Sequence, residues 1–518
     1  MQHPQGECGG AVLTLFCRVF FRSHGYFCLL ALGQRLPRLV TMPALHKIRV
    51  SPLAACAAAC AHPGVILSAL ITVMLLCSGC LLKPGALAAN ANQTLPLPKR
   101  YDATQAPVTE VKSGLLALFS DDRMRGYVEK ALASNPDLKA SAARFEEAGF
   151  NMNKAYAPMI PAVDLSGDAS RAKSRVNGNA IRSSRYSSGL DVQWEIDVWG
   201  RIRAGGGAAL SDRDAAQADY ASARESIAAQ TMQAYFDLVA AEKLLALSQR
   251  RLSSFQKTYQ LVNRRFEAGT GDLGDLDLAR TDVENTQSQL AGRKDSRDRA
   301  ARQLATLCGA YPDAKSSSGS WPSLRHGVKA GIPSTLLMKR PDIDAAYQRI
   351  RAADSRVKVA HRDLYPRFSL TASGGSQSAT LKNIADADLS VWSIAGNLTA
   401  PLIDGGQRRA ELGAANARAK QALANYQSTV LNAFREVENA LGSERYLLQQ
   451  EQSTRKALNA ARSAEARIRR NYETGLVEIL TLLDTQRRSF GTEESLINIR
   501  ALRYQNRVAL ALALGKGV

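Results

Sequence analysis

The sequence Asn135-Pro136-Asp137-Leu138 opens a long segment that begins again at Arg340-Pro341-Asp342-Ile343. Further matches follow at an offset of about 206 residues, a period far longer than the roughly 20–50 residues of a solenoid repeat. Phe266-Glu267-Ala268-Gly269, for example, is matched by Tyr472-Glu473-Thr474-Gly475. We therefore interpret the chain as the duplication of a whole half-protein, and we expect the fold to have an internal pseudo-symmetry.

Each half contains a long segment that favours uninterrupted helix. No proline or further glycine lies between Gly207 and Gly269, which predicts one helix of about 60 residues and about 90–100 Å. The second half repeats this from Gly413 to Gly475, with only Gly442 inside, and return helices are expected at 273–307 and 479–514. Such helices must pack in coiled-coil pairs, along an apolar stripe formed by Tyr220, Ile227, Met232, Tyr235 and Leu238.

Strand-like alternation of apolar and polar residues interrupts the helices once in each half. It covers residues 162–169 and 190–198 in the first half, and 368–373 and 389–399 in the second. Each pair predicts a hairpin with a long polar loop, which is Arg171 to Ser188 in the first half. Four strands are too few to close a barrel, whereas three chains would supply twelve. A small soluble β-subdomain is the alternative interpretation.

The composition excludes several classes of protein. The formal charge is +20, but acids and bases alternate along the helices, so we expect no nucleic-acid partner. Beyond position 80 the chain contains one cysteine, Cys308, and two histidines, His326 and His361. We therefore expect neither disulfides nor a metal site. No nucleophile elbow, phosphate loop or zinc-protease motif is present. We therefore expect neither an enzyme nor a cofactor.

The N-terminal region has the pattern of a secretory leader. Lys47 and Arg49 precede the apolar run of residues 65–82, which ends Leu76-Cys77-Ser78-Gly79-Cys80. Small residues before a cysteine resemble the bacterial lipobox, which predicts a leader over residues 1–79 and lipidation of Cys80. An ordinary cleaved signal and a membrane anchor are the alternatives. Arginines interrupt the first 41 residues, so we expect translation to begin near Met42.

Several segments together resemble the TolC-like outer-membrane factors, in particular the NodT-type efflux lipoproteins. They are Trp194 to Arg201, residues 332–343, Leu364 to Leu370, and Tyr472 to Arg487, in the family's order. The resemblance implies a mainly α fold with a small β part. Long coiled-coil hairpins would form a trimeric α-barrel, and four strands per chain would contribute to a twelve-stranded transmembrane β-barrel.

The resemblance also implies a function, a location and partners. The chain would be the exit duct of a tripartite efflux pump, of RND type, that passes small toxic compounds out of the periplasm. It would be a lipid-anchored homotrimer in the outer membrane of a Gram-negative bacterium. Its partners would be a periplasmic membrane-fusion adaptor protein and, through that adaptor, an inner-membrane transporter. The domains would be an anchored extension (80–120), a first repeat (121–310), a linker (311–332) and a second repeat (333–518).

The resemblance places a gate at the periplasmic tip, where the helix pairs turn. Gly269 and Gly475 lie at those turns, where glycine supplies the positive φ of a tight reversal. Leu480 and Asp484 would form the pore constriction, as an apolar ring and an acidic ring in the trimer.

Three further residues belong to the predicted tip. Tyr472 matches a position that in some family members takes part in contacts that hold the gate shut. Asp272 and Asp275 cluster on the first tip, where compensation of the helix dipole is the alternative role. For the whole chain, the alternative is a periplasmic coiled-coil adaptor or structural protein without its own barrel.

Overall fold

The computed structural model describes residues 87–91, 101–102, 114–176, 179–324, 339–384, 386–515 and 517. The predicted leader with Cys80 lies outside these residues, and so do residues 325–332 of the predicted linker. The main elements, in chain order, are α5 (Asp122–Ser134), α6 (Pro136–Tyr156), β1 (Ala162–Val176), β2 (Asn179–Ile196), α7 (Arg201–Glu267), α8 (Leu273–Leu307), α10 (Pro341–Arg362), β3 (Arg367–Ser378), β4 (Ser390–Thr399), α11 (Gln407–Glu473) and α12 (Ile479–Ala513). One-turn elements are α4 (Leu87–Asn90), η3 (Leu115–Leu118), η4 (Ala157–Met159), η5 (Leu381–Asn383) and η6 (Ala387–Leu389).

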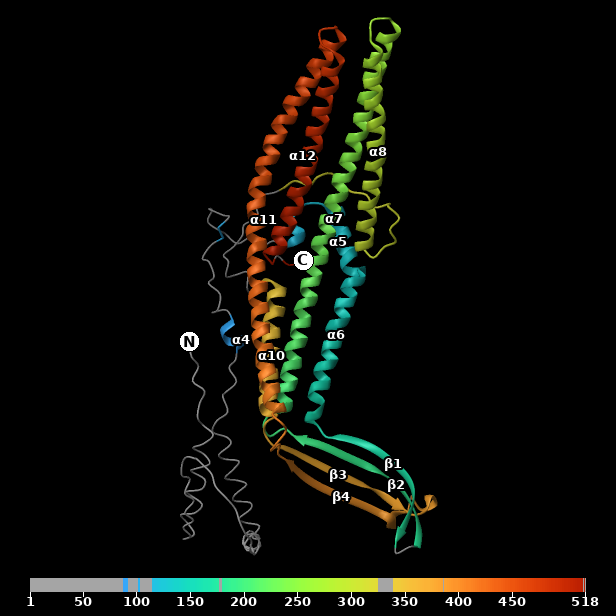
Figure 1. Cartoon of the computed structure of the whole chain (residues 1–518), viewed down its shortest axis with the longest axis vertical. Helices are drawn as coiled ribbons and strands as arrows, with labels where there is room; N and C mark the ends of the chain where they lie inside the picture. Colours follow the sequence, from blue (N-terminus) through green and yellow to red (C-terminus); the bar gives the residue numbers. More distant parts are fainter. Residues whose placement is uncertain are drawn as a thin grey trace, which may run out of the picture. The chain divides into compact units, whose positions relative to one another are not determined.

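The duplication is visible in the lengths of the helices. Helices α7 and α11 have 67 residues each, and their return helices α8 and α12 have 35 residues each. Each long helix is accompanied by two shorter ones placed end to end, α8 and α6 along α7, and α12 and α10 along α11 (Figure 1). The predicted coiled-coil hairpins are thus confirmed. Across the described ranges, no helix combines the length and apolar character needed to cross a bilayer.

The first long helix begins earlier than its glycines suggest. The sequence predicted a start near Gly207, but α7 begins at Arg201 and includes Gly205, Gly206 and Gly207. The Asp197 carboxylate accepts hydrogen bonds from the backbone N–H groups of Ile202 (3.0 Å) and Arg203 (2.9 Å), which satisfies the free donors of the first turn. Helix α11 likewise begins at Gln407 and contains Gly413.

The four strands form one antiparallel sheet in the order β1-β2-β3-β4. The polar stretch Arg171 to Ser188, predicted as a loop, is mostly strand, because β1 and β2 stay paired as far as Val176 and Asn179. The side chains of this stretch did not predict a strand, because the strands there are held together by backbone hydrogen bonds and bury no apolar face. In the second hairpin, residues 379–384 and 386–389 lie between the strands and do not enter the sheet.

The register gives the sheet one apolar and one polar face. Val163 pairs with Val192, Val192 with Ala372, and Ala372 with Ile394, which places all four on one face. The next row, on the opposite face, consists of Asp164, Asp191, Ser373 and Ser393. The apolar face is exposed in the isolated chain, as the 60% exposure of Val163 and 67% of Ile394 show.

The helical core is richest in aromatic residues where α5, α7 and α12 meet. The ring of Phe236 lies 5.0 Å from that of Phe119 and 4.9 Å from that of Tyr504. Of the predicted stripe on α7, Ile227, Met232, Tyr235 and Leu238 are buried, whereas Tyr220 is only half-buried. Cys308 is a buried free thiol in the same core.

Candidate functional site: the tips of the helical hairpins

The two hairpin turns are built alike. Gly269 and Gly475 both have positive φ, 72° and 79°, as the sequence predicted for tight reversals. The N–H of Gly269 donates to the carbonyl of Phe266 at 2.9 Å, and that of Gly475 donates to the carbonyl of Tyr472 at 3.0 Å. These bonds satisfy carbonyls at the helix ends and set the return angle of α8 and α12.

Acidic side chains gather around the beginning of the return helices. Asp272 is the N-cap of α8, and its carboxylate accepts a hydrogen bond from the N–H of Gly274 at 2.6 Å. Asp275 follows in the first turn, and burial, helped by the carboxylates of Asp272 and Glu478, raises the pKa of its carboxyl group. Asp272 therefore stabilises the start of α8, whereas the pKa of Asp275 is affected by carboxylates from both hairpins.

Tyr472 is buried between the hairpins rather than exposed at the tip. The guanidinium of Arg265 lies 4.3 Å from the centroid of the Tyr472 ring, a cation–π contact. The same guanidinium donates to the backbone carbonyls of Tyr472 (2.5 Å) and Glu473 (3.2 Å). Arg265 thus fastens the end of α7 to the end of α11.

A small apolar cluster, here called the tip cluster, joins the two hairpins around Tyr472. Its buried members come from all four helices: Phe255, Val262, Ala279, Tyr472, Ile479, Leu482 and Leu483. The apolar run 480–483 is consequently split, because Leu482 and Leu483 face the cluster while Leu480 faces solvent. Burial of the tip cluster holds the hairpins together at their ends.

Leu480 and Asp484 lie one turn apart on the exposed side of α12. Leu480 is 54% exposed, and the Asp484 side chain is 51% exposed. The Arg488 guanidinium donates to the Asp484 carboxylate at 2.8 Å. Asp484 and Arg488 are four residues apart on one helix, a spacing that favours an ion pair, but the sequence analysis did not predict this pair. An acidic ring at Asp484 would therefore lie beside a basic one.

Polar contacts behind the tip cluster tie one hairpin to the other. Arg487 on α12 binds Asp282 on α8 through both carboxylate oxygens, with distances of 2.8–3.1 Å. The buried amide of Gln486 donates to the Thr258 hydroxyl at 3.1 Å, and Arg469 donates to the Ser254 hydroxyl at 3.0 Å. None of these six residues was predicted from the sequence to be a site residue, because a polar residue on a long helix looks like an exposed one until its neighbour is known.

The sequence matches the family described as outer membrane efflux protein twice, over residues 127–310 and 332–516. The chain belongs to the outer membrane efflux protein family. It is similar to the cation efflux system protein CusC of Escherichia coli, with 27% identity over 86% of this chain and 97% of that protein. It is also similar to the outer membrane protein OprJ of Pseudomonas aeruginosa, with 30% identity over 80% and 92%.

Solved structures of outer membrane channels share the fold. The outer-membrane channel OprN superposes with a TM-score of 0.76 at 28% identity, over 82% of this chain and 97% of that one. The predicted family, the mainly helical fold with four strands per chain, the outer-membrane location and the efflux role are thereby confirmed. Members of the outer membrane efflux protein family are channels and transporters rather than enzymes.

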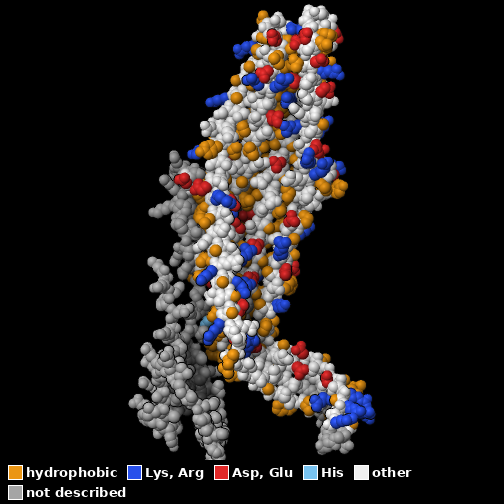
Figure 2. Space-filling model, viewed as in Figure 1, with side chains coloured by type: hydrophobic (Ala, Val, Ile, Leu, Met, Phe, Trp, Pro, Cys, Tyr) orange, Lys and Arg blue, Asp and Glu red, His pale blue; other side chains and the backbone are white. Residues whose placement is uncertain are grey.

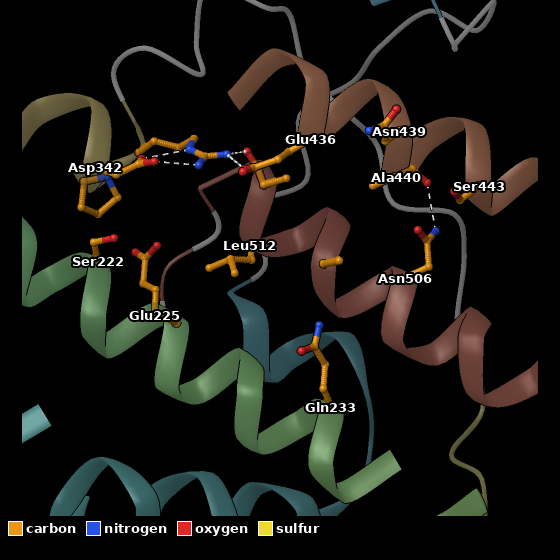
Figure 3. A pocket seen from close by; sticks show the side chains of 15 residues that line it. Ser222, Glu225, Gln233, Asp342, Glu436, Asn439, Ala440, Ser443, Asn506 and Leu512 are labelled. Atoms are coloured by element: carbon orange, nitrogen blue, oxygen red, sulfur yellow. Dashed lines mark hydrogen bonds and ion pairs between the residues drawn. The ribbon is translucent and has the colours of Figure 1, made fainter. Parts of the chain in front are cut away.

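This outer membrane efflux protein has a second polar site away from the tip, at the junction of α10 and α12. A cavity of about 460 Å³ lies there, between α7, α11 and the two helix ends (Figure 3). Arg340 binds Asp342 and Glu436, both at 2.7 Å, and Glu225 faces the same space. No group of three or more metal-binding side chains converges anywhere in the described ranges.

Proposed function

We propose that three copies of this chain form the exit duct of a tripartite efflux pump of RND type. The observation that carries the proposal is the union, in one chain, of two matched helical hairpins and a sheet with one apolar and one polar face. A sheet of this kind suits lipid on one side and a water-filled lumen on the other. The chain performs no chemical step in this proposal, because conduction requires none.

The unpaired edges of the sheet support the trimer. Strands β1 and β4 form its two edges, and backbone groups at an open edge cannot be satisfied within a bilayer. Pairing of β4 in one chain with β1 in the next closes a twelve-stranded barrel and removes the open edges. The long hairpins then line a tunnel that continues through the periplasm.

The gate in this proposal is the tip of that tunnel. Leu480 and Asp484 form the constriction, and the contacts of Arg265 with Tyr472 and of Arg487 with Asp282 hold the two hairpins of each chain together. Gly269, Gly475, Asp272 and Asp275 shape the turns. A periplasmic membrane-fusion adaptor, which connects the duct to the inner-membrane transporter, opens the gate by displacing these tips. Cys80 carries the lipid anchor in the outer membrane.

Breaking the contacts between the hairpins tests the gate. We expect the double variant Arg265→Ala, Arg487→Ala to raise the single-channel conductance of the purified protein in planar bilayers, because it removes two bridges from α11 and α12 to the neighbouring hairpin. Arg462→Ala is the matched control, since Arg462 binds Glu493 within one hairpin at 2.8 Å. Equal conductance of the double variant and the wild type would remove these bridges from the gate.

A further inference from the structure

The ribbon formed by the far ends of β1 and β2 extends past the rest of the sheet. Strand β3 ends at Ser378, opposite Tyr186, whereas β1 and β2 remain paired with each other from Ala169 and Tyr186 to Val176 and Asn179 (Figure 1). Residues 170–176 and 179–185 thus form a two-stranded projection. Lys and Arg side chains gather at this end of the sheet (Figure 2).

Four of these cations lie on one face of the ribbon. Arg171, Lys173 and Arg175 alternate along β1 and therefore point to the same side. Lys173 pairs directly with Arg182 on β2, which places Arg182 on that side as well. All four side chains are exposed. We call this set of four residues the basic face.

Among the residues that the structure describes, the basic face has no neutralising partner. Lys173 and Arg182 are like charges directly opposite each other, an arrangement that destabilises a sheet. The nearest acids along the two strands, Asp168 and Asp191, lie on the opposite face of the sheet. Within the described part of the chain, none of the four cations forms an ion pair. The four positive charges repel one another at this spacing. Their presence on one face therefore indicates an anionic partner outside the chain.

The position of the basic face identifies that partner. It continues the apolar face of the sheet, which includes Val163, Leu165 and Leu190, with Tyr186 between the apolar band and the cations. From Ala162 to Ser170, β1 rises about 26 Å at roughly 3.3 Å per residue. At a tilt of about 40° this covers roughly 20 Å, most of the roughly 25 Å height of the apolar band of an outer-membrane barrel.

We propose that the basic face binds the phosphate groups of the phosphorylated glycolipid in the outer leaflet. This inference rests on the proposed function, because it requires the apolar face to lie in the outer membrane with the ribbon on the external side. An aromatic residue at the interface, followed by cations at the level of the headgroups, is the order that a bilayer with phosphate headgroups selects. Three copies place twelve such cations around the duct.

Binding of lipid A to the full chain tests the proposal. The protein, purified in nonionic detergent, is titrated with mixed micelles that contain bisphosphoryl lipid A, phosphate-free lipid A or phosphatidylglycerol. The basic-face variant replaces Arg171, Lys173, Arg175 and Arg182 with Gln. The control variant removes the same charge from exposed helical positions by replacing Lys139, Arg299, Arg418 and Lys456 with Gln.

We expect the wild type and the control variant to bind bisphosphoryl lipid A at least about tenfold more tightly than either other lipid, and the basic-face variant to lose most of that preference. An unchanged preference in the basic-face variant, or equal binding of phosphatidylglycerol by the wild type, overturns the proposal. The milder pair Lys173→Gln, Arg182→Gln replaces the fourfold variant if that variant does not form trimers. Channel conductance of the basic-face variant separates the two proposals, because a failed duct loses conductance and failed lipid binding leaves it intact.

Discussion

Asn135 and Arg340 occupy equivalent positions in the two repeats and make the same contact with different chemistry. The Asn135 side chain donates to the carbonyl of Leu307 at 2.9 Å, and the Arg340 guanidinium donates to the carbonyl of Ala513 at 3.3 Å. The first contact joins the start of α6 to the end of α8, and the second joins the start of α10 to the end of α12. Only Arg340 adds charge, and the cavity beside it contains three carboxylates.

Glu225 in that cavity makes stability depend on pH. Burial raises the pKa of its carboxyl group, helped by Asp342, while Arg340 and Arg224 act in the opposite direction. Between the ordinary value near 4.5 and the raised value the folded state binds more protons than the unfolded state, so stability falls as pH rises through that window. We expect Glu225→Gln to raise the melting temperature at pH 7 and to change it little at pH 4. Equal shifts at both pH values would contradict this.

Asp484 is the residue whose removal should change conduction without changing stability. Its ion pair with Arg488 is exposed, so its loss should alter stability by less than about 0.5 kcal/mol. In planar bilayers we expect Asp484→Ala to alter single-channel conductance and weaken block by divalent cations, because the carboxylate attracts cations at the constriction. Asp295→Ala is the control, since Asp295 forms a similarly exposed pair with Arg299 on α8. Unchanged conductance and block would exclude Asp484 from the pore.

At the scale of the element, the start of α7 shows how packing overrides helix propensity. Glycine is normally unfavourable inside a helix, yet three in succession lie in the second turn of α7. Only Gly206 is in close contact, since a Cβ there would lie 2.3 Å from the ring of Tyr156 on α6. At Gly205 and Gly207 the nearest atoms would be 4.0 Å away.

These three glycines should respond differently to alanine. We expect Gly206→Ala to destabilise the protein by about 1–3 kcal/mol, because α6 and α7 must separate. Gly205→Ala and Gly207→Ala should each stabilise it by about 0.5–1 kcal/mol, because a methyl group fits and helix propensity improves. Thermal unfolding of the detergent-solubilised protein measures all three. If all three variants changed the stability in the same direction, helix propensity rather than the contact with Tyr156 would determine the effect of these substitutions.

At the scale of the whole molecule, a single copy of the described chain leaves surfaces of its sheet that a membrane protein must cover or pair. One face of its sheet exposes large apolar side chains such as Trp392 (79%) and Ile394 (67%), and both sheet edges are unpaired. Lipid can cover the face, but only another strand can pair with an edge. Further copies of the chain are the natural source of such strands, since β1 and β4 are antiparallel edges of the same sheet.

We therefore expect the purified protein to be a trimer that needs detergent or lipid. Light scattering coupled to size exclusion measures the mass of the protein component, and deletion of the gene should sensitise the cells to a panel of toxic compounds. Fractionation of the membranes serves as the control for location. A compact monomer that stays in solution without detergent would contradict both the trimer and the duct.

The sequence alone determined the duplication, the return helices from Leu273 and Ile479, and the positive φ at Gly269 and Gly475. Each depends on local chemistry, because helix propensity and glycine freedom act within a few residues. Only the tertiary structure decided where α7 begins, that most of the stretch from Arg171 to Ser188 is strand, and which arginines bridge the hairpins. Those features depend on residues far apart in the chain, such as Tyr156 against Gly206 and Asp282 against Arg487. No local pattern specifies such contacts, because their energy exists only once the helices and strands have packed.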